Sequence, residues 1–399
     1  MNLLKFEFKK YVFKPYVLIL IVACTVINLA GAYFSCAEYK YWYDEENFQK
    51  IYNSKLKGKL TDDKINYVIS ETERLNSLIQ DRTFSREYDP NTYTGLIFAD
   101  DTLFSRDVHP RMEYAVGYAY DMNRIVEKAD ENLAFLSDKQ NPYEMKKNAQ
   151  IISLYSNRSI QEFYDLMGMK YFLHYDFSSL LALLLCILII VPVFVGESET
   201  KMDQLLPSFK NGREKLVRTK IKFTFVVVFL ISLWFSIWDM IGFALFSPLR
   251  GFDATLYALE VFRYTPLNLN IWQYILLSFL LRTLGLSTLA ALILLASRLF
   301  KKTIYVFTVS AAAIFIPYLS QFVVKDHFKF LELINPALLI KNRYLFMNYT
   351  AQNFFNTPVS PAIPAVFANL ILISIAVTLI SQLSKGSQPF RKGLSKAKP

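Results

Sequence analysis

The sequence predicts an all-α polytopic membrane protein, with six transmembrane helices and a large, mainly helical extracytoplasmic domain between helices 1 and 2. Composition is the first reason: 53% of the 399 residues are apolar and only 20% are charged, against roughly 25% charged in soluble proteins. The second reason is that long uncharged stretches recur along the chain. Three Cys and three His argue against a disulfide scaffold or a zinc domain.

Six stretches approach or exceed the roughly 20 apolar residues that cross a bilayer. They are apolar on every face, unlike the amphipathic helices of a soluble core. We expect transmembrane helices at residues 16–37, 177–196, 223–246, 271–297, 303–324 and 363–384. Asp239 and Arg282 are the only charged residues in these stretches.

The first stretch shares two features with a cleaved signal peptide, a basic start and an Ala30-Gly31-Ala32 triplet. Its apolar run is longer than the apolar region of a typical signal peptide. The residues before Cys36 do not form a lipobox. We therefore expect an uncleaved transmembrane helix, with cleavage as the alternative.

The distribution of Lys and Arg predicts that both termini are cytoplasmic. With the N-terminus inside, the short cytoplasmic segments hold nineteen Lys and Arg, and the short outer loops hold six. We expect a multi-pass protein of the bacterial cytoplasmic membrane with a basic cytoplasmic tail at 385–399. The net charge of +10 then reflects topology and contact with membrane lipids, and no nucleic acid is needed to explain it.

Residues 1–15 are expected to form an interfacial elbow helix with one apolar and one basic face. The apolar face contains Leu4, Phe8, Tyr11 and Val12, and the basic face contains Lys5, Lys9 and Lys10. Such a helix lies in the inner leaflet with its lysines near anionic headgroups. The alternative is an ordinary basic topology signal.

The extracytoplasmic domain, residues 38–176, has 18 basic and 24 acidic residues and no Cys. Helical spacing of apolar residues predicts one helix after Thr61 and a second after Pro110. A third is expected from Tyr143 towards Tyr171, continuing into the second span. The Tyr and Phe clusters of this domain form either a ligand surface or the packing that replaces disulfides.

Residues 197–222 are expected to form a cytoplasmic coupling loop. Its acidic residues suit the start of a short helix, and its Leu-rich ridge needs cover from a partner protein. The residues expected to dock the partner are Glu197, Glu199, Met202, Asp203, Leu205, Leu206, Pro207, Ser208, Arg213 and Lys220.

The order of these residues resembles the segment between the second and third spans of ABC-2 type ABC-transporter permeases. In that family an acidic residue just past the second span precedes Leu-Leu with Ser or Pro, then Arg, then Lys. Here Glu197 or Glu199, Leu205-Leu206-Pro207-Ser208, Arg213 and Lys220 fill these positions. The resemblance covers most of the membrane part, including the elbow helix. A basic linker that matches by chance is the alternative.

The resemblance implies the permease subunit of an ABC transporter, an exporter of a lipid, peptide or antibiotic-like amphipathic cargo. The sequence has no G-x-x-x-x-G-K-[ST] phosphate loop, so a separate ATP-binding subunit would bind ATP and Mg and dock on the coupling loop. A second permease copy, identical or paralogous, would complete the complex. No catalytic residue, metal or cofactor is expected in this chain.

The extracytoplasmic loop at 325–362 also resembles the family. Its Ile334-Asn335-Pro336 and Asn356-Thr357-Pro358-Val359 segments look like the half-inserted, re-entrant helices that precede the last span of such permeases.

Charged residues inside a membrane usually face a cavity or a partner. Arg282 would lie about 16 Å into its span, and Asp239 about 10 Å nearer the outer side, so a direct ion pair requires Arg282 to reach upward. We expect Arg282, Asp239, Ser278 and Gly285 to line a substrate path or an interface between permeases. The alternative is an internal bridge that fixes helix packing.

Two other classes of function fit part of the sequence. A membrane sensor or immunity protein would bind a ligand with its extracytoplasmic domain and signal through the cytoplasmic loop, but this leaves the six spans unexplained. A membrane enzyme acting on lipid or glycan lacks convergent acid, base or metal-binding residues at the membrane face.

Overall fold

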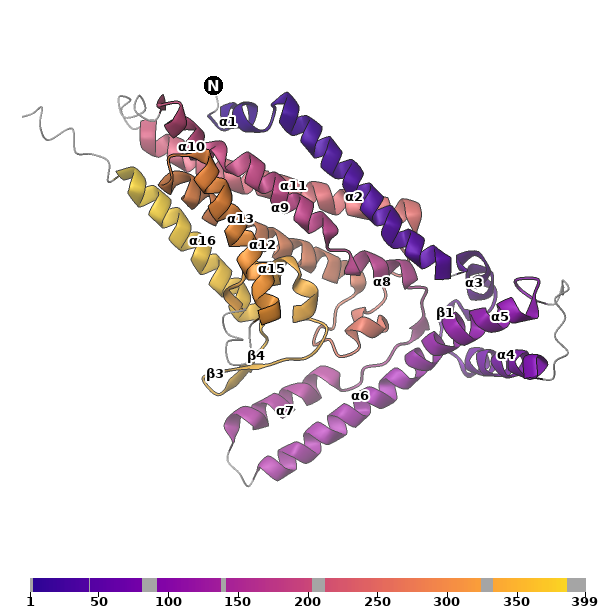
Figure 1. The fold of residues 1–399 in the computed structure, drawn as a ribbon. Coiled ribbons are helices and arrows are strands. Elements are labelled where there is room, and N and C mark those ends of the chain that lie inside the picture. The colour runs from indigo at the N-terminus through magenta and orange to yellow at the C-terminus, as the bar shows by residue number, and fades with distance from the viewer. Residues whose placement is uncertain are drawn as a thin grey trace, which may run out of the picture.

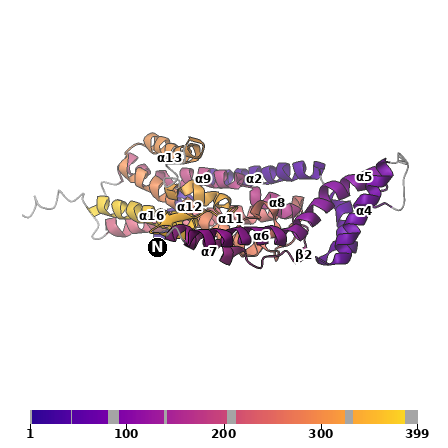
Figure 2. The same ribbon diagram turned by 90° about the horizontal axis from the view of Figure 1, so that it is seen from below.

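A computed structural model describes residues 3–42, 44–80, 92–137, 141–202, 212–323 and 333–385. A bundle of apolar helices makes up one part of the molecule (Figure 1). The helical hairpin α6–α7 runs across one end of the bundle, and α3, α4 and α5 lie beyond it (Figures 1 and 2).

The bundle is built from helices of the two chain ends and the middle. They are α1 (Leu3–Tyr11), α2 (Pro15–Trp42), α8 (Met167–His174), α9 (Phe177–Ile190), α10 (Pro192–Glu199), α11 (Gly212–Phe246), α12 (Ile271–Leu299), α13 (Thr303–Val323) and α16 (Ala362–Lys385). Short elements join them: η5 (Leu256–Ala258), η6 (Glu260–Phe262), α15 (Pro336–Ile340), η8 (Asn342–Leu345), β3 (Gln352–Phe354) and β4 (Thr357–Val359).

Five helical stretches of the described chain are long and apolar enough to cross a membrane. They are Pro15–Ala37, Met167–Glu199, Glu214–Phe246, Ile271–Leu299 and Ala362–Leu383. The prediction of an all-helical membrane bundle is thus confirmed at this level. The helix α13 occupies the remaining expected span, but its side chains are described only as far as residue 313, and Thr303–Ala313 alone is too short to cross. A sixth span stays a prediction.

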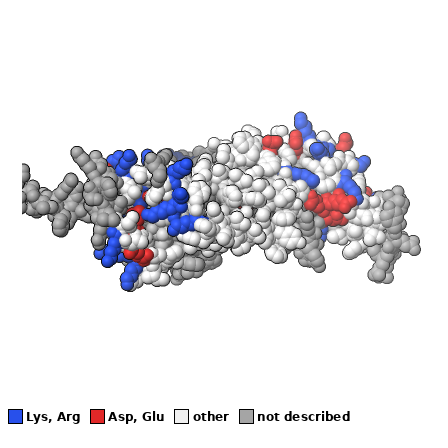
Figure 3. Space-filling model, turned by 90° about the horizontal axis from the view of Figure 1, so that it is seen from above, with Lys and Arg blue, Asp and Glu red and all other residues white. Residues whose placement is uncertain are grey.

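The surface charges of the molecule are separated along its length. Figure 3 shows an uncharged band between one end of the bundle, which is rich in Lys and Arg, and the end where α3, α4 and α5 lie, which carries both signs. An uncharged band between two charged ends is typical of a chain that spans a bilayer. That the basic end faces the cytoplasm remains a prediction from the distribution of Lys and Arg.

The second spanning segment is broken into α8, α9 and α10. Pro192 opens α10, and because proline has no N–H, the ladder of backbone hydrogen bonds is interrupted there. Ser297 of α12 repairs the break: its hydroxyl donates to the carbonyl of Val191 at 2.6 Å and accepts from the N–H groups of Phe194 and Val195, both at 3.1 Å. The break therefore fastens α10 to α12.

Within the expected domain of residues 38–176, the described residues of 44–163 are mainly helical, as expected, and are called here the helical domain. Its elements are α3 (Glu45–Ile51), η1 (Tyr52–Leu56), β1 (Gly58–Lys59), α4 (Asp62–Gln80), α5 (Ile97–Leu103), η2 (Phe104–Val108), α6 (His109–Leu136), α7 (Pro142–Tyr155) and β2 (Glu162–Phe163). The expected helix from Tyr143 to Tyr171 is wrong. It ends at Tyr155, because Asn157 takes a positive φ of 60° and turns the chain into β2, which pairs antiparallel with β1.

Tyrosines fasten the helical domain to the connection between α11 and α12. The hydroxyl of Tyr114 donates to the carbonyl of Tyr257 at 2.7 Å, and that of Tyr155 to the carbonyl of Tyr264 at 2.6 Å. The guanidinium of Arg158 donates to the carbonyl of Thr265 at 2.7 Å. These three hydrogen bonds hold the helical domain against the bundle.

Gly285 in α12 allows α15 to approach closely. A Cβ atom at Gly285 would lie 2.7 Å from the carbonyl oxygen of Pro336 and 2.8 Å from Cγ1 of Ile340. Gly285→Ala is therefore expected to displace α15 and destabilise the fold by about 1–3 kcal/mol. The measurement is the thermal melting midpoint in detergent, followed through exposure of the buried thiols of Cys24, Cys36 and Cys186.

Gly117→Ala is the matched control for this substitution. Gly117 lies within α6, and a Cβ there meets nothing within 4 Å. Alanine is favoured over glycine inside a helix by about 1 kcal/mol, so this variant should melt at the same temperature or higher. If both variants melt alike, the close approach at Gly285 has no energetic consequence.

Candidate functional site

The ends of the expected coupling loop are joined by a buried ion pair. Glu197 on α10 is 8% exposed and Lys220 on α11 is fully buried, and the carboxylate lies 2.5 Å from the ammonium. The Lys220 ammonium also donates to the carbonyl of Val193. Because α11 already begins at Gly212, Lys220 lies on a helix and not in the loop where the sequence was expected to place it.

Two further helices are attached to the same short segment. The ammonium of Lys10 on α1 donates to Glu197 at 2.8 Å, and the hydroxyl of Tyr11 donates to the carbonyl of Val193 at 3.1 Å. At the end of α10, the Glu199 carboxylate accepts from the backbone N–H of Thr303, the first residue of α13, at 2.7 Å.

These contacts define a site that we call the α10 junction, made of Lys10, Glu197, Glu199, Lys220 and Ser297. It connects α10 with α1, α11, α12 and α13 at the basic end of the bundle. A force applied to the end of α10 would therefore reach four other helices through short polar contacts.

The rest of the expected docking surface is described only at its edge. Met202 is 54% exposed. Asp203, Leu205, Leu206, Pro207 and Ser208, and the side chain of Arg213, lie outside the described residues.

Sequence reasoning missed Glu7 and placed Lys10 only on a lipid-facing surface. Glu7 on α1 is 1% exposed, and its Oε2 atom has no hydrogen-bond partner in the described chain. Burial raises the pKa of the Glu7 carboxyl, an effect that nearby Lys220 and Lys10 partly offset. The signal that could have found it is that Glu7 is the single acidic residue of an otherwise basic helix.

Glu7→Gln is expected to raise the melting midpoint at pH 7, because a neutral amide does not carry the desolvation cost of a buried carboxylate. A raised pKa means that folding favours the protonated carboxyl, so the contribution of Glu7 to stability declines as the pH rises through its ordinary value of 4.5 towards the folded value. Glutamine is neutral at every pH, and the advantage of the variant should vanish below about pH 4.5. Melting curves from pH 4 to pH 8 test this, with the exposed Glu113 replaced by Gln as the control.

A second polar site lies among the apolar helices. The carboxylate of Asp239 on α11 lies 3.4 Å from Nη1 of Arg282 on α12. It also accepts from Nδ2 of Asn28 at 2.7 Å and from the hydroxyl of Ser178 at 2.6 Å. We call these four residues the Asp239 cluster. It links α2, α9, α11 and α12 inside the bundle.

Asp239 and Arg282 form a direct ion pair, although helical rise alone places them about 10 Å apart in depth. Such a pair required Arg282 to reach towards Asp239, and its Nη1 atom lies 3.4 Å from the carboxylate. Arg282 Nη2 also donates to the Ser178 hydroxyl at 3.1 Å, whereas its buried Nε has no partner in the described chain.

A cavity of about 100 Å³ lies next to the Asp239 cluster. Its polar lining includes Tyr175, Asp176, Ser278, Asn342 and Arg343 together with Asp239 and Arg282. The Arg343 guanidinium lies 3.3 Å from the Asp176 carboxylate, and Asn342 donates to the backbone carbonyl of Ser278 at 3.2 Å. The structure thus brings Arg282, Asp239 and Ser278 together around one cavity, whereas Gly285 lies apart, against α15.

The described residues contain no group of three or more His, Cys, Asp or Glu side chains placed to hold a metal ion. Comparison with protein-family models, with curated proteins and with solved structures finds no match to this chain.

Proposed function

We propose that this chain is the permease subunit of an ABC transporter and that it exports an amphipathic cargo such as a lipid, a peptide or an antibiotic-like molecule. The observation that carries the proposal is the α10 junction. This junction connects α10, next to which a motor subunit would bind, with α1, α11, α12 and α13. Such connections are needed to transmit a force from the motor to the bundle.

In this mechanism a separate ATP-binding subunit, which holds ATP and Mg, docks on the segment Glu197–Ser208. Closure of the motor moves α10. The buried pair of Glu197 and Lys220 transfers that movement to α11, Lys10 transfers it to α1, and Glu199 transfers it to α13. Rigid-body movement of this kind switches a bundle between two packings.

The Asp239 cluster would then lie on the moving surface between α11 and α12. A buried ion pair that shares its oxygens with Ser178 and Asn28 can exchange partners when the helices shift, because two neutral donors remain for the carboxylate. Its cavity of about 100 Å³ is too small for an amphipathic cargo. A path of that size would open between this chain and a second permease copy, identical or paralogous.

Co-purification tests the proposal. An untagged protein of about 25–35 kDa with a phosphate loop should accompany the native chain extracted in mild detergent. The Leu205→Asp and Leu206→Asp double variant should lose it while keeping its melting midpoint. The matched control is a second double variant, in which Val116 and Tyr120 are replaced by Asp. Both are exposed hydrophobic residues of α6, on the opposite side of the proposed membrane.

The competing class is a membrane sensor or immunity protein that signals through the same loop. In that case no ATPase would accompany the chain, and a protein without a phosphate loop would be lost in the double variant. Retention of the ATPase by the double variant would refute docking on the segment Glu197–Ser208.

A further inference from the structure

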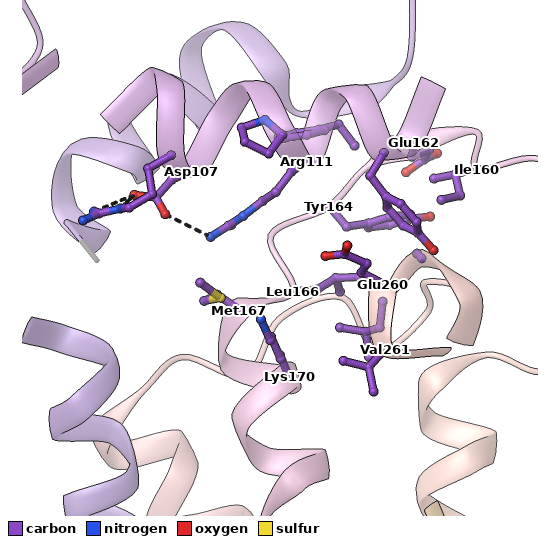
Figure 4. A pocket seen from close by; sticks show the side chains of 17 residues that line it. Asp107, Arg111, Ile160, Glu162, Tyr164, Leu166, Met167, Lys170, Glu260 and Val261 are labelled. Carbon is purple, nitrogen blue, oxygen red and sulfur yellow. Dashed lines mark hydrogen bonds and ion pairs between the residues drawn. The ribbon is translucent and has the colours of Figure 1, made fainter. Parts of the chain in front are cut away.

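A cavity of about 250 Å³ lies between the helical domain and the bundle. The N-terminal half of α6 forms one wall, and the segment from β2 into α8 together with η6 forms the other (Figure 4). Neither the α10 junction nor the Asp239 cluster contributes to it.

Six charged side chains line this cavity: Arg106, Asp107, Arg111, Glu162, Lys170 and Glu260. Three of them form ion pairs, since Asp107 lies 2.8 Å from Arg106 and 3.9 Å from Arg111. Arg111 is further held by Asp165 at 3.6 Å and lies over the ring of Phe48 at 4.8 Å. Arg111 is therefore fixed in place with its guanidinium directed into the cavity (Figure 4).

Lys170, Glu162 and Glu260 differ from this group. None of the three has an ion-pair partner within 4.0 Å in the described part of the chain, and Lys170 and Glu260 point into the same space (Figure 4). An anionic ligand would pair with Lys170 but oppose Glu260, and a cationic ligand would do the reverse. A ligand that carries both charges satisfies both side chains.

The position of the cavity indicates where such a ligand comes from. Met167 and Lys170 lie in the first turn of the apolar stretch Met167–Glu199, so the cavity is at the end of the bundle, where lipid headgroups lie. Trp272 is 46% exposed at the start of α12, and aromatic residues are enriched at membrane interfaces. Leu166, Leu259 and other apolar residues complete the lining.

We propose that this cavity binds a phosphoethanolamine group, with its phosphate at Lys170 and its primary ammonium at Glu260. Its volume lies below the roughly 300–1,000 Å³ of sites that enclose drug-sized molecules, so it holds a headgroup and leaves the acyl chains outside. The same group occurs free in solution, and the two sources are separated by experiment.

The test uses the full-length protein in an uncharged sugar detergent and isothermal titration calorimetry. The probes are dihexanoyl-phosphatidylethanolamine, dihexanoyl-phosphatidylglycerol, which lacks the ammonium, and free phosphoethanolamine. The native chain should prefer the ethanolamine lipid. Lys170→Gln should weaken binding of both lipids about ten-fold or more, as expected for a lost charged hydrogen bond. Glu260→Gln should remove the preference for the ethanolamine lipid.

Glu127→Gln and Lys128→Gln, at exposed positions of α6 outside the cavity, are the matched controls and should bind as the native chain does. Binding of free phosphoethanolamine with the same dependence on Lys170 and Glu260 supports the site with a soluble source. Equal binding of the two lipids by the native chain, or binding unchanged in both cavity variants, overturns the proposal. Because no ATPase subunit is present, these outcomes are independent of the proposed transport function.

Discussion

Glu197→Leu is expected to destabilise the protein by about 3–5 kcal/mol, the usual cost of removing one partner of a buried ion pair. Lys220 is fully buried, and without the carboxylate its ammonium keeps, among the described residues, only the carbonyl of Val193 as an acceptor. The double variant Glu197→Leu with Lys220→Met should recover most of this loss, since an apolar pair replaces both charges. Melting midpoints of the three variants, read from exposure of the buried thiols, test the prediction.

Arg218→Met provides the control on the same helix. Arg218 and Glu214 form an ion pair at 2.7 Å, but their side chains are 72% and 54% exposed, so its loss should change stability by no more than about 0.5 kcal/mol. A Glu197→Leu variant that melts like Arg218→Met would contradict the role of the buried pair. The double variant also tests the proposed function, because a stable but uncoupled protein should lose ATP-stimulated transport.

Asp239→Leu is also expected to destabilise the protein by about 3–5 kcal/mol, because it removes one partner of a buried ion pair. The loss of stability should be larger than that caused by Arg282→Leu. Without Asp239, the guanidinium of Arg282 keeps only the hydroxyl of Ser178, and its Nε already lacks a partner in the described chain. Without Arg282, the carboxylate keeps two donors, Asn28 and Ser178. The double variant should again be more stable than Asp239→Leu alone.

Transport assays separate the two roles of the Asp239 cluster. Arg282→Leu should assemble normally but export less in the presence of ATP. Unchanged export would leave the cluster with a structural role only, as an internal bridge between helices. Thr283→Val is the neighbouring control: Thr283 bonds to Ser232 at 2.7 Å, outside the cluster, and its loss should cost about 1 kcal/mol with no effect on export.

Local patterns predicted some elements of the helical domain and not others. The start of α4 is indicated by acidic residues in its first turn, and the start of α6 by a proline in its first turn. Both signals are local, since they depend only on neighbouring residues. The end of α7 at Tyr155 was missed because the apolar spacing continues beyond it. The helix ends there because Asn157 adopts a positive φ and the following residues pair, as β2, with the distant β1.

The candidate site was predicted in part. Asp239 and Arg282 were selected as charged residues within apolar stretches, which is a property of composition. Glu197 and Lys220 were selected because they fill positions of the pattern that resembles ABC-2 permeases. Which of them contact one another is a property of helix rotation and tilt. The sequence therefore indicated no pairing of Glu197 with Lys220, and it gave Ser297 and Glu7 no role.

Composition by itself determined that this chain is a helical membrane protein, because uncharged stretches of bilayer length have no other stable environment. It also determined the grouping of basic residues at one end of the bundle. Only the tertiary structure decided that α10 joins four helices, that Asp239 meets Arg282, and that Lys170 and Glu260 face one cavity beneath the docked helical domain. The reason is physical: hydrophobicity acts on each segment independently, whereas ion pairs and cavities depend on how distant segments are packed together.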